Sequence, residues 1–171
     1  MASTLDLRHT IHCDEDTYWW KIVFDEAFNK AMYVDHMKFL DWSVLDSRQD
    51  DDKLVRRVRV EPKVGDLPGP VKKVLGDRLS YVEEGTFDKK SRRYRIHVVP
   101  SALPDKTKID GEMWCEKGAS DKEVVRHARF TVEVKVLMVG KLVEDRILGD
   151  LRKSYEDGTV FTNDYIKKNS L

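Results

Sequence analysis

Residues 123–153 read EVVRHARFTVEVKVLMVGKLVEDRILGDLRK, and the hydrophobic period changes part-way along this stretch. From Glu123 to about Met138 apolar and polar residues alternate, which is typical of a β-strand with one buried and one wet face. From Val139 onward the period becomes 3.6, which predicts a long helix. A helix of this kind has to lie on a concave apolar surface, and we expect the rest of the chain to build that surface. The expected inward stripe of the helix consists of Glu144, Ile147, Leu148, Leu151, Tyr155, Gly158, Thr162 and Tyr165.

Earlier segments alternate in the same way and are predicted to be strands. They cover residues 5–13, 37–47, 54–60, 79–87, 94–98 and 108–116. Between the first two, Asp14 occupies a helix N-cap position, and two short helices are expected up to Tyr33. Short polar turns between the later strands predict an antiparallel meander. We therefore expect an α+β fold, in which a curved seven-stranded antiparallel sheet wraps around the long C-terminal helix.

The composition limits the class of protein. A chain of 171 residues without an obvious linker is expected to be a single domain over residues 1–171. Lysine plus arginine equals aspartate plus glutamate at 31 each, so the basic excess of a nucleic-acid-binding protein is missing and no nucleic acid is expected as a partner. Neither a signal peptide nor a membrane span of ~18 apolar residues is visible. Two cysteines, Cys13 and Cys115, are expected to be reduced thiols in a cytoplasmic protein.

Three segments, together with the order of elements, resemble a known superfamily. They are CDEDTYWWKIVFD (residues 13–25), LPGPVKKVLGDRLSYVEEGTFD (67–88) and VEVKVLMVGKLVEDRILGDLRK (132–153). The chain resembles the helix-grip fold of the START-like (SRPBCC, birch-pollen-allergen-like) proteins, most closely a bacterial branch known as a domain of unknown function. A proline of that pattern near Leu137 or Met138 is missing here. The resemblance implies a cavity between sheet and helix that takes a lipid, sterol or polyketide, and relatives include cyclases, hydrolases and carriers.

Polar residues on the expected inner face of the sheet are His9, Arg56 and Glu83. A charge in that place has to be paired or hydrogen-bonded, because leaving it bare costs several kcal/mol. One interpretation is that Arg56 and Glu83 pair with each other or reach the rim of the sheet. The other is that one of them anchors the polar head of an apolar ligand. Glu83 could also act as a general base if burial raised its pKa.

The expected ligand-binding residues are the inward side chains of the strands and of the last helix. The loop at 65–75 and the region 29–39 are expected to form the mouth of the cavity. Of the adjacent Trp19 and Trp20 only one can face inward, so the other is expected at a rim. The strand arginines at 57, 59, 93, 95, 126 and 129 are expected to face outward. The ligand-binding set comprises Trp42, Arg56, Val58, Tyr81, Glu83, Tyr94, Ile96, Met113, Phe130, Val132, Ile147, Leu151 and Tyr155.

No motif for metal binding or catalysis stands out. The five histidines lack the spacing of a metal site, and no G-x-S-x-G elbow occurs. The GDLPGP segment at 65–70 lacks the lysine and the Ser or Thr of a phosphate-binding loop. We therefore expect no cofactor, no metal and no identifiable catalytic residue.

The leading functional hypothesis is a non-enzymatic binder or carrier of a hydrophobic small molecule such as a lipid or sterol. One alternative is an enzyme of the same fold, a cyclase or hydrolase that uses Glu83 or a tyrosine of the cavity. Another is a protein-interaction module with a filled core. Transient membrane contact is a further expectation, through whichever of Trp19 and Trp20 lies at the rim.

Overall fold

The computed structural model describes residues 1–171 and contains one seven-stranded antiparallel sheet. The strand order is β1-β7-β6-β5-β4-β3-β2, so every strand pairs with its neighbour in the chain except β1, which pairs with β7. This arrangement confirms the predicted sheet. The strands are β1 (Ser3–Ile11), β2 (Asp41–Gln49), β3 (Lys53–Glu61), β4 (Tyr81–Asp88), β5 (Arg93–Pro100), β6 (Thr107–Lys117) and β7 (Val124–Val134).

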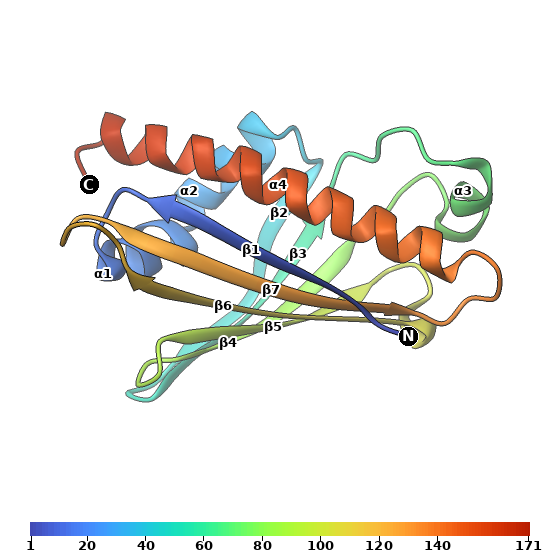
Figure 1. Ribbon diagram of the computed structural model, residues 1–171, viewed down its shortest axis with the longest axis horizontal. Coiled ribbons are helices and arrows are strands. Elements are labelled where there is room, and N and C mark those ends of the chain that lie inside the picture. Colours follow the sequence, from blue (N-terminus) through green and yellow to red (C-terminus); the bar gives the residue numbers. More distant parts are fainter.

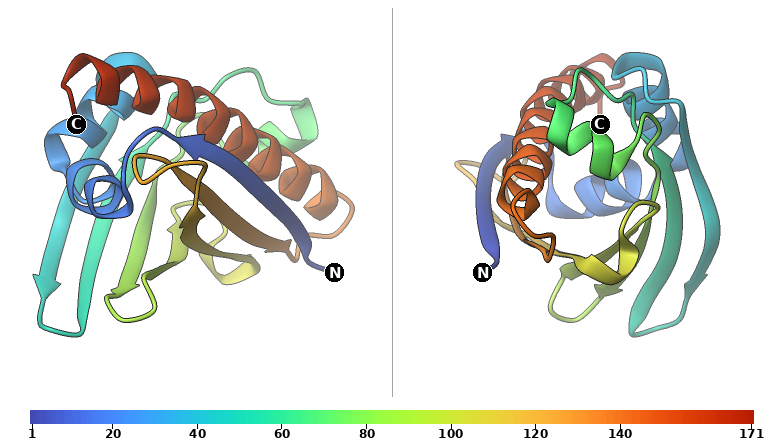
Figure 2. Two further views of the ribbon diagram at one scale, coloured as in Figure 1. Left: turned by 60° about the vertical axis from the view of Figure 1, so that its left-hand side comes forward. Right: turned by 90° about the vertical axis from the view of Figure 1, so that its right-hand side faces the viewer.

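The long helix α4 (Gly140–Lys168) crosses the concave face of the sheet (Figure 1). Viewed nearly along this helix, the strands curve from β1 on one side around to β2 on the other (Figure 2). The buried side chains of α4 include Val143, Glu144, Thr162 and Ile166, and Tyr155 packs partly buried against the core. The predicted grip of the sheet on the helix is therefore present.

The junction between β7 and α4 differs from the prediction. The strand ends at Val134 rather than near Met138, and a loop leads to Gly140. The first turn of α4 packs directly on the end of the strand, because a Cβ atom at Gly140 would lie 2.4 Å from the carbonyl oxygen of Val134. Leu137 and Met138 are 90% and 91% exposed. Their apolar character extended the predicted strand, although both lie in the loop.

Two short helical segments follow β1 and cover one end of the sheet (Figure 1). Helix α1 (Glu15–Thr17) continues as a π-helical turn over Tyr18–Val23, and α2 (Glu26–Lys30) continues as another over Ala31–His36. Asp14 caps α1 as predicted, accepting a hydrogen bond from the Thr17 amide at 2.9 Å. Widened turns leave backbone carbonyls without their usual partners. The buried Asn29 side-chain amide donates to two carbonyl oxygens at the end of the first of these turns, those of Ile22 and Val23, and also to that of Asp25, which keeps its helical partner, the Asn29 backbone amide.

The interior consists of separate clusters of buried hydrophobic side chains. The largest joins the α1–α2 pair to the sheet and to the second half of α4. A smaller one gathers around Val71 of α3 (Gly69–Leu75) and the first half of α4, at the opposite end of the molecule. The third lies between β2 and β3 around Trp42. A short 3-10 turn, Pro104–Lys106, precedes β6.

The outer face of the sheet is a mixture of charges. Ion pairs cross neighbouring strands, for example Arg57 with Glu84 at 3.6 Å and Arg93 with Glu112 at 3.2 Å. Trp19 is fully buried and Trp20 is 39% exposed, as their adjacency predicts. None of the helices has both the length and the apolar composition needed to cross a lipid bilayer.

Candidate functional site

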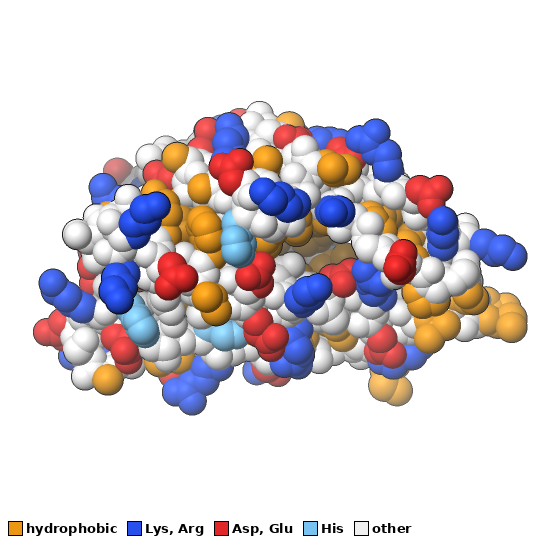
Figure 3. Space-filling view, turned by 90° about the horizontal axis from the view of Figure 1, so that it is seen from above, with side chains coloured by type: hydrophobic (Ala, Val, Ile, Leu, Met, Phe, Trp, Pro, Cys, Tyr) orange, Lys and Arg blue, Asp and Glu red, His pale blue; other side chains and the backbone are white.

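A pocket of about 80 Å³ lies between the sheet and the second half of α4, and the α1–α2 pair closes it at one end. Seen from the helix side, the molecular surface is hollowed near its middle, with hydrophobic side chains visible inside (Figure 3). Residues from β2, β3, β4, β5, β6 and β7 reach the pocket, as do residues of both short helical segments. Most of the lining is hydrophobic.

The structure brings some of the predicted site residues to this pocket and leaves others elsewhere. Trp42, Arg56, Glu83, Tyr94, Ile96, Met113 and Tyr155 line it. Val58 and Tyr81 pack in the β2–β3 cluster, Phe130 and Leu151 in the largest cluster, and Val132 and Ile147 in the cluster around α3. Strand alternation indicates which face a residue is on, but not how far along the sheet the pocket extends.

Other residues of the pocket were missed because they come from the short helices and from small residues of α4. The region 29–39 was predicted as a mouth, and its residues Asn29, Met32 and Tyr33 do line the pocket. The loop 65–75 does not. Its Val71 is buried against the first half of α4, at the other end of the molecule. The pocket residues outside both the predicted ligand-binding set and the predicted mouth are Tyr18, Ile22, Val23, Phe28, Arg126, Ser154, Gly158 and Thr162, of which Gly158 and Thr162 lie on the predicted inward stripe of the helix.

Arg126 corrects the prediction that it faces outward. It has the same parity on β7 as Ala128 and Phe130, points inward with them, and is only 6% exposed. Its Nη2 donates to Nδ1 of His9 and to Oγ1 of Thr159, each at 2.8 Å. The guanidinium carbon lies 4.8 Å from the centre of the Tyr155 ring. The Nε atom is buried without a hydrogen-bond partner.

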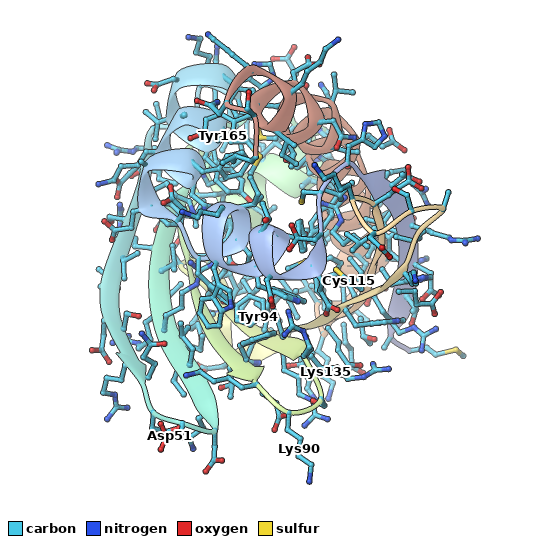
Figure 4. All side chains as sticks on the ribbon, turned by 90° about the vertical axis from the view of Figure 1, so that its left-hand side faces the viewer. Asp51, Lys90, Tyr94, Cys115, Lys135 and Tyr165 are labelled. Carbon is cyan, nitrogen blue, oxygen red and sulfur yellow. The ribbon has the colours of Figure 1, made fainter.

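Arg56 is the second buried arginine of the pocket, at 7% exposure. Its Nε donates to the Tyr94 hydroxyl at 3.1 Å, and its guanidinium lies 5.0 Å from the centre of the Phe24 ring. Tyr94 can reach this position because Gly85 has no side chain, since a Cβ atom there would lie 1.9 Å from the Tyr94 hydroxyl. Figure 4 shows Tyr94 inside the molecule beneath the short helices, whereas Asp51 and Lys90 lie at hairpin ends.

Glu83 is the acidic residue of the pocket. Burial raises the pKa of its carboxyl above the ordinary 4.5, and the nearby positive charge of Arg56 opposes this shift only in part. The side chain forms neither an ion pair with Arg56 nor a hydrogen bond, and Arg56 does not reach the rim. The predicted pairing is therefore wrong, and so is a position of Arg56 at the rim. Burial, followed by the charge of Glu83, also raises the pKa of Tyr33, which places that phenol near the carboxyl.

His9 faces inward as predicted and supports Arg126 from β1. Because an arginine always donates, Nδ1 of His9 accepts and the ring is neutral with its proton on Nε2. Burial and then the charge of Arg126 lower the pKa of this histidine below 6.5. His, Cys, Asp and Glu side chains form no group of three that could hold a metal ion. Cys13 and Cys115 are free thiols, and burial raises the pKa of each to about 12.

Comparison with known proteins places the chain in a family. A family model described as a protein of unknown function (DUF2505) matches residues 6–166. The chain belongs to the DUF2505 family. No curated protein sequence matches it.

Solved structures share the fold of this DUF2505 protein. A protein from Thermus thermophilus is 13% identical with a TM-score of 0.66, over 99% of this chain and 100% of that one. The ZhuI aromatase/cyclase from a Streptomyces species is 15% identical with a TM-score of 0.57, over 96% and 90%. Norcoclaurine synthase from Thalictrum flavum, in complex with dopamine and hydroxybenzaldehyde, is 12% identical with a TM-score of 0.65, over 98% and 88%. At these identities the likeness confirms the helix-grip fold and does not extend to activity.

The chemistry available to this DUF2505 protein follows from its pocket. Aromatic and aliphatic walls can bury an apolar group, and two guanidinium groups and a carboxyl can orient a polar one. The volume of about 80 Å³ is well below the ~300–1,000 Å³ that is usual for small-molecule sites. A larger ligand therefore requires movement of the elements around the pocket.

Proposed function

We propose that this protein binds a hydrophobic small molecule of the lipid or sterol class between the sheet and α4. The observation that supports this function best is the pocket itself, with largely hydrophobic walls and few polar groups. Apolar burial at ~25 cal/mol per Å² would supply the affinity, and the polar groups would fix the orientation of the ligand.

The size of the pocket favours a flexible chain over a rigid ring system. A space of about 80 Å³ holds only part of a lipid. An acyl chain can enter in part and follow the shape of the walls, whereas a sterol nucleus has to fit as one piece. The side expected to give way is the α1–α2 pair, because it contains two π-helical turns, and such turns are frequent at functional sites.

The test places a bulky side chain of α4 in the pocket and measures the binding of the neutral dye Nile red. Ser154 lines the pocket, and Lys153 beside it on the same helix is exposed. We expect wild type and Lys153→Phe to bind the dye saturably and Ser154→Phe to lose at least ~90% of the binding, as when a ligand site is occluded. Native mass spectrometry of freshly purified protein should show a co-purifying lipid mass. Absence of both signals in wild type would favour an interaction module with a filled core.

A second candidate is an enzyme that uses Glu83 as a general acid or base. It is favoured by the raised pKa of this carboxyl inside the pocket. Two structures of the same fold are an aromatase/cyclase and norcoclaurine synthase. Retained dye binding with lost turnover in Glu83→Gln would support catalysis, whereas dye binding without turnover of any small aromatic substrate would count against it.

A further inference from the structure

The positive charges in the pocket are not balanced by acidic partners. Arg56 and Arg126 are 7% and 6% exposed, and neither forms an ion pair with a carboxylate. The hydrogen-bond partners of these two arginines are a phenol, an imidazole and a threonine hydroxyl, all of them neutral groups. Burying a charge without an opposite partner is costly, so such groups in native proteins require an explanation.

Many guanidinium donors also remain without an acceptor. A guanidinium carries five N–H groups. Arg126 donates only through Nη2, and its Nε is buried with no partner. Arg56 donates only through Nε. Both side chains line the same pocket, where the polar end of a ligand would supply an acceptor to any donor that reaches it.

Glu83 does not neutralise this charge. It is the one acidic side chain of the pocket and forms no ion pair with either arginine. Even when it is ionised, two guanidinium groups and one carboxylate leave an excess of one positive charge. Burial raises the pKa of Glu83 and so favours its neutral form, which enlarges the excess.

We infer that the pocket takes a molecule whose hydrophobic body ends in a carboxylate, and that Arg126 and Arg56 bind this carboxylate. The inference rests on the proposed function, because the same pocket holds the hydrophobic body. A carboxylate supplies negative charge that the pocket lacks, and it is small enough for this space. Hydrogen bonds between guanidinium and carboxylate are about twice as strong as neutral ones.

Arg126 is the better anchor of the two, because its position is fixed before a ligand arrives. His9 and Thr159 hold its Nη2, and the Tyr155 ring lies against its guanidinium. Thr159 is itself oriented, since its hydroxyl donates to the Tyr155 carbonyl oxygen at 2.7 Å. A guanidinium fixed in this way loses little conformational freedom when it binds a carboxylate.

The test compares decanoate with 1-decanol, which share a chain and differ in the charged head. Displacement of Nile red from wild type should require at least ~10-fold less decanoate than decanol, the range of one charge-assisted hydrogen bond. Arg126→Met should abolish this preference while still binding decanol. The matched control is Arg129→Met, on the outer face of the same strand, where Arg129 pairs with Asp6 at the surface. It should keep the wild-type preference.

The outcomes separate the two proposals. Equal displacement by decanoate and decanol in wild type would overturn the carboxylate inference and leave hydrophobic binding intact. Failure of Nile red to bind wild type, or of both compounds to displace it, would overturn the proposed function and the inference with it. The wild-type comparison needs no variant, so it decides the question even if Arg126→Met does not fold.

Discussion

At the scale of single residues, Glu83 gives the stability of the protein a defined dependence on pH. Its folded-state pKa is raised above 4.5, chiefly by burial, so the folded protein binds this proton more tightly than the unfolded chain does. The resulting stabilisation is fully present below about pH 4.5 and is lost as the pH rises through the folded-state value. Glu83→Gln removes the titration. We therefore expect the free energy of unfolding of the variant, relative to that of wild type, to be higher at pH 7 than at pH 5. Urea unfolding at both pH values measures this difference.

The control for this prediction is Glu84→Gln, which removes a carboxylate from the exposed face of the same strand, where it pairs with Arg57. If both variants changed the difference between pH 5 and pH 7 by the same amount, burial of Glu83 would not be the cause. The dye assay on the same samples checks that each variant keeps its pocket.

The two arginines show how far single residues could be placed from the sequence. The inward position of Arg56 was predicted correctly, because Arg56 lies two residues from Val58 on the same face of the strand. Arg126 shares its parity with Ala128 and Phe130, and this signal was available. The usual exposure of charged residues argues against the inner face that this parity indicates, and the outward prediction followed the charge. That expectation fails where neutral acceptors and an aromatic ring surround the guanidinium. Such partners come from distant parts of the chain and cannot be found by periodicity.

At the scale of elements, Asn29 ties the two short helical segments together. Its side-chain amide donates to the carbonyl oxygens of Ile22 and Val23, at the end of the first widened turn. Asn29→Ala would leave these buried carbonyls unsatisfied, and we expect it to lower the free energy of unfolding by about 1–3 kcal/mol. Denaturant unfolding measures this change. Asn169→Ala removes one exposed bond, to the Tyr165 carbonyl at the end of α4, and should change stability by less than ~0.5 kcal/mol.

The sequence predicts the boundaries of helices and strands correctly where a cap or a turn marks them. It does not do so where apolar residues continue from a strand into a loop. Asp14 marks the start of α1 by a side-chain hydrogen bond that can be expected from its position. The end of β7 is set by the packing of Gly140 on the Val134 carbonyl, a contact that periodicity does not reveal. The π-helical turns were also missed, because six residues are too few to distinguish a slightly wider helical period.

At the scale of the whole molecule, the two ends beneath α4 differ in construction. One end holds the pocket and is closed by the α1–α2 pair. The other holds a compact cluster around Val71 of α3, and the pocket at that end is formed mostly by polar residues of the loop at 64–77. Hydrophobic patterning predicted that the sheet grips the helix but assigned one mouth to the loop at 65–75. The sequence contains no signal for which end holds the hydrophobic pocket, because that depends on how completely side chains from separate elements fill the space.

This asymmetry predicts where ligand entry changes local stability. A pocket of about 80 Å³ cannot admit a lipid-sized molecule without local opening, and a ligand that bridges the sheet and the α1–α2 pair stabilises the closed arrangement. On saturation with Nile red, amide hydrogen exchange should slow in residues 15–36 and stay unchanged in α3, the internal control. Mass spectrometry of peptic fragments measures both regions in one sample. If exchange slowed in α3 and did not change in residues 15–36, molecules would enter beside the loop at 65–75. Entry past the short helices would then be wrong.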